Sequence, residues 1–406
     1  MKLRTKQSRL ILWTALAALS GAVIPSWAGT NVVAWGAGTF ISSPPDYNNY
    51  GQSIVPASLT NASYVAAGWR HSLALDSHGS LAGWGDDTLG QIDFPAGETD
   101  FVAIACGRQH SLALEANGQL LGAGDDVYGQ IDVPSGLSNV VAVSAGFYHS
   151  LVLKADGSVA VWGTSTNLAT IGTDPNYGQA LIPAGLSNVV AVAAGGWHNL
   201  ALHPDGTVSG WGRNDYYQAY PPPWLSNAVA ISGGAAHSLA LRADGTVVAW
   251  GANTYGQTNV PAGLSNVVAI SAGGWHNLAL KADGTVVAWG AGGPGTNVTV
   301  DCGQNMVPAG LTNVQQVAGG NVNSLALIGV GPPVTGVRLT GLTFGTNGFS
   351  VSFPTRNGRV YRLEYKISLG AAAWQALPLQ AGTGGKLTLT DPAPASPQGF
   401  YRVREW

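Results

Sequence analysis

Residues 188–212 read NVVAVAAGGWHNLALHPDGTVSGWG, and close copies of this stretch recur along most of the chain. A β-rich apolar run leads into a glycine turn, and an alternating run then starts at His198. An Asp-Gly turn follows, and a third run ends in Trp-Gly. Alternation with a period of two predicts strands, and Asp-Gly supplies the positive φ that a tight hairpin needs. Each copy therefore predicts one antiparallel sheet.

Two short motifs that recur in every copy give the number of copies. The first is a histidine before Ser or Asn and Leu, with Asn323 in its place in the last copy. Successive copies are spaced by 39, 39, 49, 39, 39 and 47 residues. The second is Trp-Gly or its variant at Ala123, which also occurs seven times. The histidines of the first anchor are His71, His110, His149, His198, His237 and His276.

One unit is split between the two ends of the repeat region. The first Trp-Gly, at Trp35, precedes the first histidine, and no Trp-Gly follows Asn323. We therefore expect residues 31–36 to pair beside residues 324–327 and close a ring, which would remove exposed sheet edges. Gly-Gln followed by Val-Pro, as in residues 256–261, predicts a short fourth strand at each outer edge. Seven such sheets predict a seven-bladed β-propeller closed by the N-terminal strand.

Composition supports an all-β protein. Charged residues make up 10% of the chain, with 4 Glu and 6 Lys, so a helical bundle or coiled coil is excluded. Hydrophobic residues make up 46%, which is enough to bury a large core and excludes a disordered chain. The 57 glycines follow no three-residue period, so the chain is not collagen-like.

The first 28 residues predict a secretory signal peptide. A basic start precedes an apolar stretch from Leu10 to Ile24, and Ser26-Trp27-Ala28 supplies a small-x-small cleavage site. An uncleaved N-terminal anchor is the alternative. No later segment reaches 18 apolar residues without Gly, Asn or Asp, so we expect no membrane span in the mature chain. The expected location is secreted, periplasmic or at the cell surface, and the expected state is a monomer.

Charge marks a domain boundary. Residues 29–336 carry 6 basic and 18 acidic side chains, whereas residues 337–406 carry 8 basic and 3 acidic ones. We place the propeller at 29–330, a Gly-Pro linker at 331–336 and a C-terminal module at 337–406. The acidic main body argues against a nucleic-acid partner.

The repeat resembles a known family. The sequence of residues 188–212, with Gly-Gln-x-x-Val-Pro before such units, is similar to the repeat of the regulator of chromosome condensation family over about residues 31–328. That family folds as seven-bladed propellers. The short units resemble a compact secreted bacterial branch that includes a β-lactamase inhibitory protein. This resemblance implies a noncatalytic protein-binding scaffold, and inhibition of an enzyme is one form of it.

The C-terminal module has its own pattern. Residues 349–353, 360–365 and 386–390 alternate as strands do. Together with GFYRVREW at residues 399–406, they resemble a small β-sandwich of the fibronectin type that is common on exported bacterial proteins. Attachment and terminal stabilisation are the two roles left open.

Catalytic and metal-binding signatures are absent from the sequence. It has no G-x-S-x-G, H-E-x-x-H or phosphate-binding glycine loop. A histidine that recurs in every unit is most simply part of that unit, so we assign the repeated histidines to structural hydrogen bonding. Asp86-Asp87 and Asp125-Asp126 lack the density of oxygen ligands that calcium needs, and we interpret them as turn residues. We therefore expect no catalytic residue, cofactor or metal.

The two residues before each histidine are the candidate binding residues. They vary between copies while their neighbours do not, and they favour aromatic residues and Arg, which dominate binding hot spots. Scattered surface aromatics are the alternative interpretation. The predicted anchors are Trp69, Arg70, Arg108, Phe147, Tyr148, Trp197 and Trp275. The fifth copy has Ala235-Ala236 and should contribute least.

Topology places these turns on one face. Alternate turns of an antiparallel sheet lie at the same end, so the pre-histidine turns share a face with the segments after Trp-Gly. Three of those segments are longer than the others, at residues 37–51, 164–177 and 291–302. Insertions on one face of a repeat protein often mark its binding face. The resulting prediction is a protein partner of unknown identity, bound there.

Two further alternatives use other residues. Carbohydrate could stack on the same aromatics, with Tyr216, Tyr217, Tyr220 and Trp224 extending the surface. An enzyme acting on an extracellular polymer would need convergent carboxylates, for which Asp46, Asp174 and Asp301 in the three longer segments are the candidates. Cys106 and Cys302 are either a disulfide across the face or two thiols.

Overall fold

The computed structural model describes residues 31–38, 49–95, 97–164, 175–293, 301–330, 341–345, 348–366, 374–383, 385–392 and 400–406. All the regular elements in these ranges are strands. The signal peptide predicted at residues 1–28 and the linker at 331–336 lie outside the described residues.

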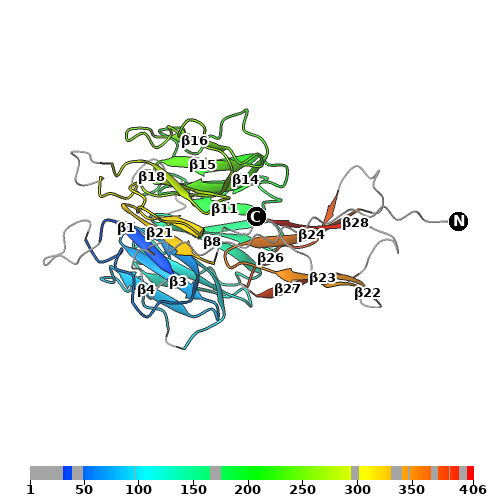
Figure 1. The fold of residues 1–406 in the computed structure, drawn as a ribbon. Helices are drawn as coiled ribbons and strands as arrows, with labels where there is room; N and C mark the ends of the chain where they lie inside the picture. Colours follow the sequence, from blue (N-terminus) through cyan, green and yellow to red (C-terminus); the bar gives the residue numbers. More distant parts are fainter. Residues whose placement is uncertain are drawn as a thin grey trace, which may run out of the picture.

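Seven three-stranded antiparallel sheets form the propeller, as predicted (Figure 1). Blade one consists of β2 (Ala62–Ala67), β3 (His71–Asp76) and β4 (Leu81–Gly85). Blades two and three are β5 (Phe101–Cys106), β6 (His110–Glu115) and β7 (Leu120–Gly124), then β8 (Val140–Ala145), β9 (His149–Lys154) and β10 (Val159–Gly163). Blades four and five are β11 (Ala191–Ala194), β12 (His198–Leu202) and β13 (Val208–Gly212), then β14 (Ala228–Gly233), β15 (His237–Arg242) and β16 (Val247–Gly251). Blade six is β17 (Val267–Ala272), β18 (His276–Lys281) and β19 (Val286–Gly290).

The seventh blade confirms the predicted closure. It combines β20 (Val314–Gly319) and β21 (Asn323–Ile328) with the N-terminal β1 (Val32–Gly36), and Trp35 lies opposite Ser324 in the register. Two side chains join this blade to blade one. Asn31 donates to the Ala62 carbonyl and accepts from the Ala62 amide, and the Gln316 amide bonds both backbone groups of Val65.

The predicted fourth strand does not form. Residues 256–261 are turn and irregular structure because their hydrogen bonds go to side chains and local turns. The Gln257 side-chain oxygen accepts from the Tyr255 amide, and the Asn259 amide bonds the Gly256 carbonyl. Pro261 has no amide hydrogen to offer a ladder. The segment instead lies along the outer strand of the next blade, where the Gln257 carbonyl accepts from the indole of Trp289 at 3.1 Å.

The repeated histidines link each blade to the next. Each Nε2 atom lies 2.8 to 3.2 Å from the side chain of a Ser or Asn, which is the second residue of the central strand of the following blade. Where the acceptor is Ser238, its hydroxyl donates onward to the carbonyl of Gln218, so Nε2 of His198 must carry the proton. Asn277 serves equally, because its oxygen accepts from His237 while its nitrogen donates to Gln257. The histidines are structural, as predicted.

Close packing surrounds each histidine. The glycine three residues before it contacts the ring, and a Cβ added at Gly195 would lie within about 3 Å of His198 and of the Gly234 carbonyl. The Leu-Ala-Leu residues that follow are fully buried in the contacts between blades. The sequence keeps Gly, His and Leu-Ala-Leu together because they fill one blade interface.

The C-terminal module is a β-sandwich. One sheet consists of β22 (Gly341–Gly345), β23 (Gly348–Pro354) and β27 (Lys386–Asp391). The other consists of β24 (Val360–Lys366), β25 (Gln375–Ala376), β26 (Gln380–Ala381) and β28 (Phe400–Glu405). Val351, Phe353, Leu363 and Leu389 pack between the two sheets. In Figure 1 the module extends from one side of the propeller.

The substitution Asn323→His should stabilise the propeller. Asn323 is shorter than histidine, and both polar atoms of its side chain lack a hydrogen-bond partner. The turn before it matches the others, since the Gly320 amide bonds the Asn323 carbonyl as Gly273 bonds His276. A histidine there could reach Ser72 and should add about 1 kcal/mol to the free energy of unfolding. A lower melting temperature than that of the wild type would contradict this account.

Acid should unfold the propeller well above the range in which its aspartates titrate. Complete burial lowers the pKa to about 4 for His71, His149 and His237, and to about 3 for His110, His198 and His276. The native state therefore holds these rings neutral, whereas the unfolded chain binds protons below a pH of about 6.5. Stability is full above that pH and falls as the pH drops below it.

Denaturant titrations between pH 7.5 and 5.5 measure the effect. Between pH 7.5 and 5.5 the six buried rings should together lower the free energy of unfolding by several kcal/mol. Each ring contributes about 1.4 kcal/mol per pH unit below pH 6.5. A free energy of unfolding that stays constant between these pH values would show that the rings are not held neutral in the fold.

Candidate functional site

The seven pre-histidine turns form a closed ring on one face. Each turn donates a backbone amide to a carbonyl of the next turn, from Trp69 to Gly107 at 3.1 Å and finally from Asn321 back to Gly68 at 3.1 Å. The ring surrounds a depression on the propeller axis with a volume of about 200 Å³. The turns are thus held both by the buried histidines below and by backbone bonds to each other.

The first residues of six of the variable pairs line this depression. Two of them, Trp69 and Phe147, form an aromatic cluster with Trp197, which is the second residue of its own pair. The Phe147 ring lies between Trp69 and Trp197, with centroid distances of 4.8 and 4.6 Å and edge-to-face geometry. A Cβ at Gly196 would clash with the Phe147 ring, so this glycine makes room for the cluster. The guanidinium of Arg108 stacks on Trp69 at 5.0 Å.

In four of the seven pairs, the second residue points outward and meets a tyrosine. Tyr148 packs on Tyr128 at 5.1 Å and Trp275 packs on Tyr255 at 5.6 Å. Arg70 stacks on the ring of Tyr50 at 4.7 Å and donates to its hydroxyl at 3.2 Å. These tyrosines stand two residues before the repeated glutamine, so their constant spacing is the signal that could have identified them.

Trp197 is the most tightly packed of the outward residues. Its ring contacts Tyr177 at 6.2 Å as well as Phe147, and Arg213 stacks on Tyr177 and Trp197 at 4.5 and 5.1 Å. Arg213 was not among the residues predicted from the sequence. It lies directly after a Trp-Gly anchor, a position that is not basic in any other copy.

All seven predicted anchors lie on this face, and the structure brings them into contact with one another or with the tyrosines. They are half-buried rather than freely projecting. The face is therefore a preassembled surface of edge-to-face rings and stacked guanidinium groups. Blade five differs as expected, because Ala235 and Ala236 are buried and add no side chain to the surface.

The structure gives less support to the other candidates from the sequence, which are the cysteine pair and the three aspartates. Cys106 and Cys302 do not form a disulfide, and burial raises the pKa of the Cys106 thiol to about 12. Asp301 accepts a hydrogen bond from the Gly292 amide at 2.9 Å, whereas Asp46 and Asp174 lie outside the described residues. Among the described residues, no group of three His, Cys, Asp or Glu side chains could hold a metal ion.

The opposite face of the propeller is covered by the C-terminal module. The Gly358 amide bonds the Val102 carbonyl at 3.0 Å, and the Leu379 amide bonds the Ala155 carbonyl at 2.9 Å. Arg404 donates to the Pro204 carbonyl at 3.0 Å, beside the Asp-Gly turn of blade four. Val360, Leu379 and Trp406 extend the hydrophobic core of the propeller. The module therefore blocks this face around the axis.

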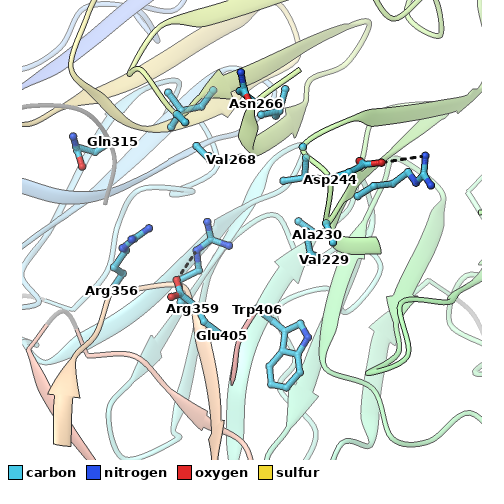
Figure 2. A pocket seen from close by; sticks show the side chains of 18 residues that line it. Val229, Ala230, Asp244, Asn266, Val268, Gln315, Arg356, Arg359, Glu405 and Trp406 are labelled. Atoms are coloured by element: carbon cyan, nitrogen blue, oxygen red, sulfur yellow. Dashed lines mark ion pairs between the residues drawn. The ribbon is translucent and has the colours of Figure 1, made fainter. Parts of the chain in front are cut away.

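A cavity of about 540 Å³ remains between the propeller and the module (Figure 2). Arg356, Arg359 and Trp406 line it from the module, opposite Asn266 and Gln315 of the propeller. Glu405 forms an ion pair with Arg359 at 3.7 Å. Sequence reasoning did not find this cavity, because its residues come from a repeat and a non-repeat region with no shared period.

The comparisons agree with this geometry. A family model described as "Regulator of chromosome condensation (RCC1) repeat" matches residues 63–91, 101–130, 140–167, 189–218, 228–257 and 267–295. The repeats of this propeller belong to the regulator of chromosome condensation repeat family. The six matched segments are blades one to six, and the family model does not match the split seventh blade. No curated protein sequence matches the chain.

Solved structures share the fold. Prp20p from Saccharomyces cerevisiae is 18% identical, with a TM-score of 0.57 over 75% of this chain and 92% of that one. Human WBSCR16 is 19% identical, with a TM-score of 0.53 over 74% of this chain and 100% of that one. At this identity the likeness concerns the fold. Within the described part of the chain, no helix is long and apolar enough to cross a membrane.

The aromatic cluster predicts unequal costs for two tryptophan substitutions. Trp197→Ala removes contacts with Phe147, Tyr177 and Arg213 and should lower the free energy of unfolding by about 3 kcal/mol. Trp275→Ala loses one edge-to-face partner and should cost about 1 kcal/mol. Thermal and denaturant melts measure both values. Equal costs would show that the cluster around Phe147 does not hold the face together.

Proposed function

We propose that the chain is an exported, noncatalytic scaffold that binds a protein partner through the face of the pre-histidine turns. The observation that carries this proposal is that one face of the propeller is covered and the other is exposed. The C-terminal module covers one face, and the other presents a ring of seven turns with clustered aromatic rings and arginines. Such residues supply most of the energy in protein interfaces.

Rigidity favours this face as a binding surface. The turns are fixed by backbone bonds to each other and by the buried histidines, so docking would order few side chains. The anchor side chains are half-buried, so part of each remains open to a partner. Prp20p, a relative in fold, was studied for its binding to Gsp1p and histones, and the same yeast protein is seen bound to Kap60. Protein binding is thus compatible with the fold.

Arginines stacked on aromatic rings are a second feature of the pre-histidine face. Residues 29–336 carry six basic side chains, and three of them lie on the pre-histidine face: Arg70, Arg108 and Arg213. The other three lie at Asp-Gly turns on the covered face: Lys154, Arg242 and Lys281. Each of them forms an ion pair with the aspartate two residues later, as Arg213 does with Asp215 on the pre-histidine face. Cationic groups stacked on aromatic rings are suited to acidic side chains at the centre of an interface. Inhibition of an enzyme is the form of binding that the resemblance to the compact secreted branch implies.

Matched variants on the two faces test the proposal. Trp275→Ala and Arg108→Ala should each weaken binding to a captured exported protein by about 2 kcal/mol, because both remove hot-spot side chains. The control Lys281→Ala removes a cation from an Asp-Gly turn on the covered face and should leave the affinity unchanged. Calorimetry on the purified pair measures the three affinities. If the affinity falls only with Lys281→Ala, the interface lies on the covered face and the proposal is contradicted.

A further inference from the structure

Blade five departs from the other blades in two positions that act together. At the residue before the repeated glutamine, six copies have a glycine in the left-handed region, with φ between 72° and 81°. The seventh copy has Tyr217, which adopts the same conformation with φ of 62°. The six glycines are Gly51, Gly90, Gly129, Gly178, Gly256 and Gly303. A left-handed tyrosine is disfavoured, and strain of this kind is a pointer to function.

The second departure is a small residue, Ala236, which leaves the neighbouring ring of Tyr216 uncovered. Tyr216 occupies the tyrosine position that in other blades packs on the residue before the histidine. In blade five that residue is Ala236, so the Tyr216 ring has no aromatic partner among the described residues and is 50% exposed. Tyr217 is 71% exposed, Tyr220 60% and Trp224 65%. Four aromatic rings therefore face solvent within one segment between β13 and β14.

The backbone holds this segment rigidly. The Tyr217 amide bonds the Asn214 carbonyl, the Tyr220 amide bonds the Tyr217 carbonyl, and the Leu225 amide bonds the Pro222 carbonyl. Three consecutive prolines, 221–223, restrict the chain further. The rings are thus presented in fixed positions, which lowers the entropy lost when a ligand stacks on them.

A groove adjoins the same segment. It has a volume of about 400 Å³, within the range of about 300–1,000 Å³ typical of small-molecule sites, and Tyr220 and Pro221 form one wall. Pro183 and Leu186, from the segment between β10 and β11, also line it. His203 and Ser209 lie in the lining as well, with Nε2 at 2.9 Å from Oγ, and supply polar groups beside the apolar walls.

The chemistry of these residues is that of a neutral sugar site. The ionic groups at the start of the segment, Arg213 and Asp215, pair with each other at 2.6 Å. An acidic ligand would therefore meet no unbalanced cation in this segment. The apolar faces of sugar rings stack on exposed Tyr and Trp rings, and their hydroxyls can bond phenol, indole and imidazole groups. We propose that residues 216–224, with the groove beside them, bind a neutral polysaccharide.

The variant Tyr217→Gly separates binding from folding. It restores the residue that six other copies use at this left-handed position, so its melting temperature should equal or exceed that of the wild type. It also removes the most exposed ring. Retention on a neutral polysaccharide, in affinity gels or pull-downs with cellulose, xylan, chitin and amylose, should fall at least tenfold. Trp224→Ala, at a 65% exposed position, should show the same loss with unchanged stability.

The controls lie on the neighbouring blade and in the choice of polymer. Tyr255→Ala removes the equivalent of Tyr216 in blade six, where Trp275 covers it, and should leave retention unchanged. Polygalacturonate, which is acidic, should not be retained. The proposal is overturned if the wild type retains none of the four neutral polymers, if it retains only polygalacturonate, or if Tyr217→Gly and Trp224→Ala retain them as well as the wild type. Loss of a protein partner instead of a polysaccharide in these two variants would also overturn it.

Discussion

The propeller depends on one buried hydrogen bond that is repeated from blade to blade. A neutral histidine donates from Nε2 to a Ser or Asn of the next blade, and that residue donates to a glutamine carbonyl that also accepts from the Trp-Gly indole in five copies. Buried polar groups are costly unless paired, so each chain of bonds fixes the distance and orientation of two blades. In a protein with 10% charged residues, this network replaces ion pairs as the source of specific contacts between blades.

This arrangement also explains why the neighbouring residues are free to vary. The glycine and the histidine are constrained by contact with each other, and the turn between them is held by its backbone amide. Its two side chains take no part in the contact between glycine and histidine, so they can differ between copies without loss of the fold. The aromatic cluster around Phe147 and the alanines of blade five are two outcomes of the same freedom.

The sequence was sufficient to predict the features that repeat. Seven units, the pairing of Trp35 with the last blade and the face that carries the pre-histidine turns all follow from spacing and antiparallel geometry. The prediction of a fourth strand was wrong. The spacing of the repeat does not show that Gln257 directs its hydrogen bonds to a turn and to the next blade. Contacts between units were also hidden: the edge-to-face cluster and the docking of Trp406 depend on residues that no repeat relates.

The split seventh blade has a kinetic consequence. The Trp35 indole bonds the Gln304 carbonyl across 269 residues of sequence, so the last sheet can form only when both ends of the repeat region are present. Closing so long a loop is entropically costly and slow. Once the seventh blade has formed, neither β1 nor β21 can separate from it without breaking a complete strand pairing. A ring joined in this way is expected to assemble late and to unfold slowly, and its lifetime is set by the barrier to opening that one sheet.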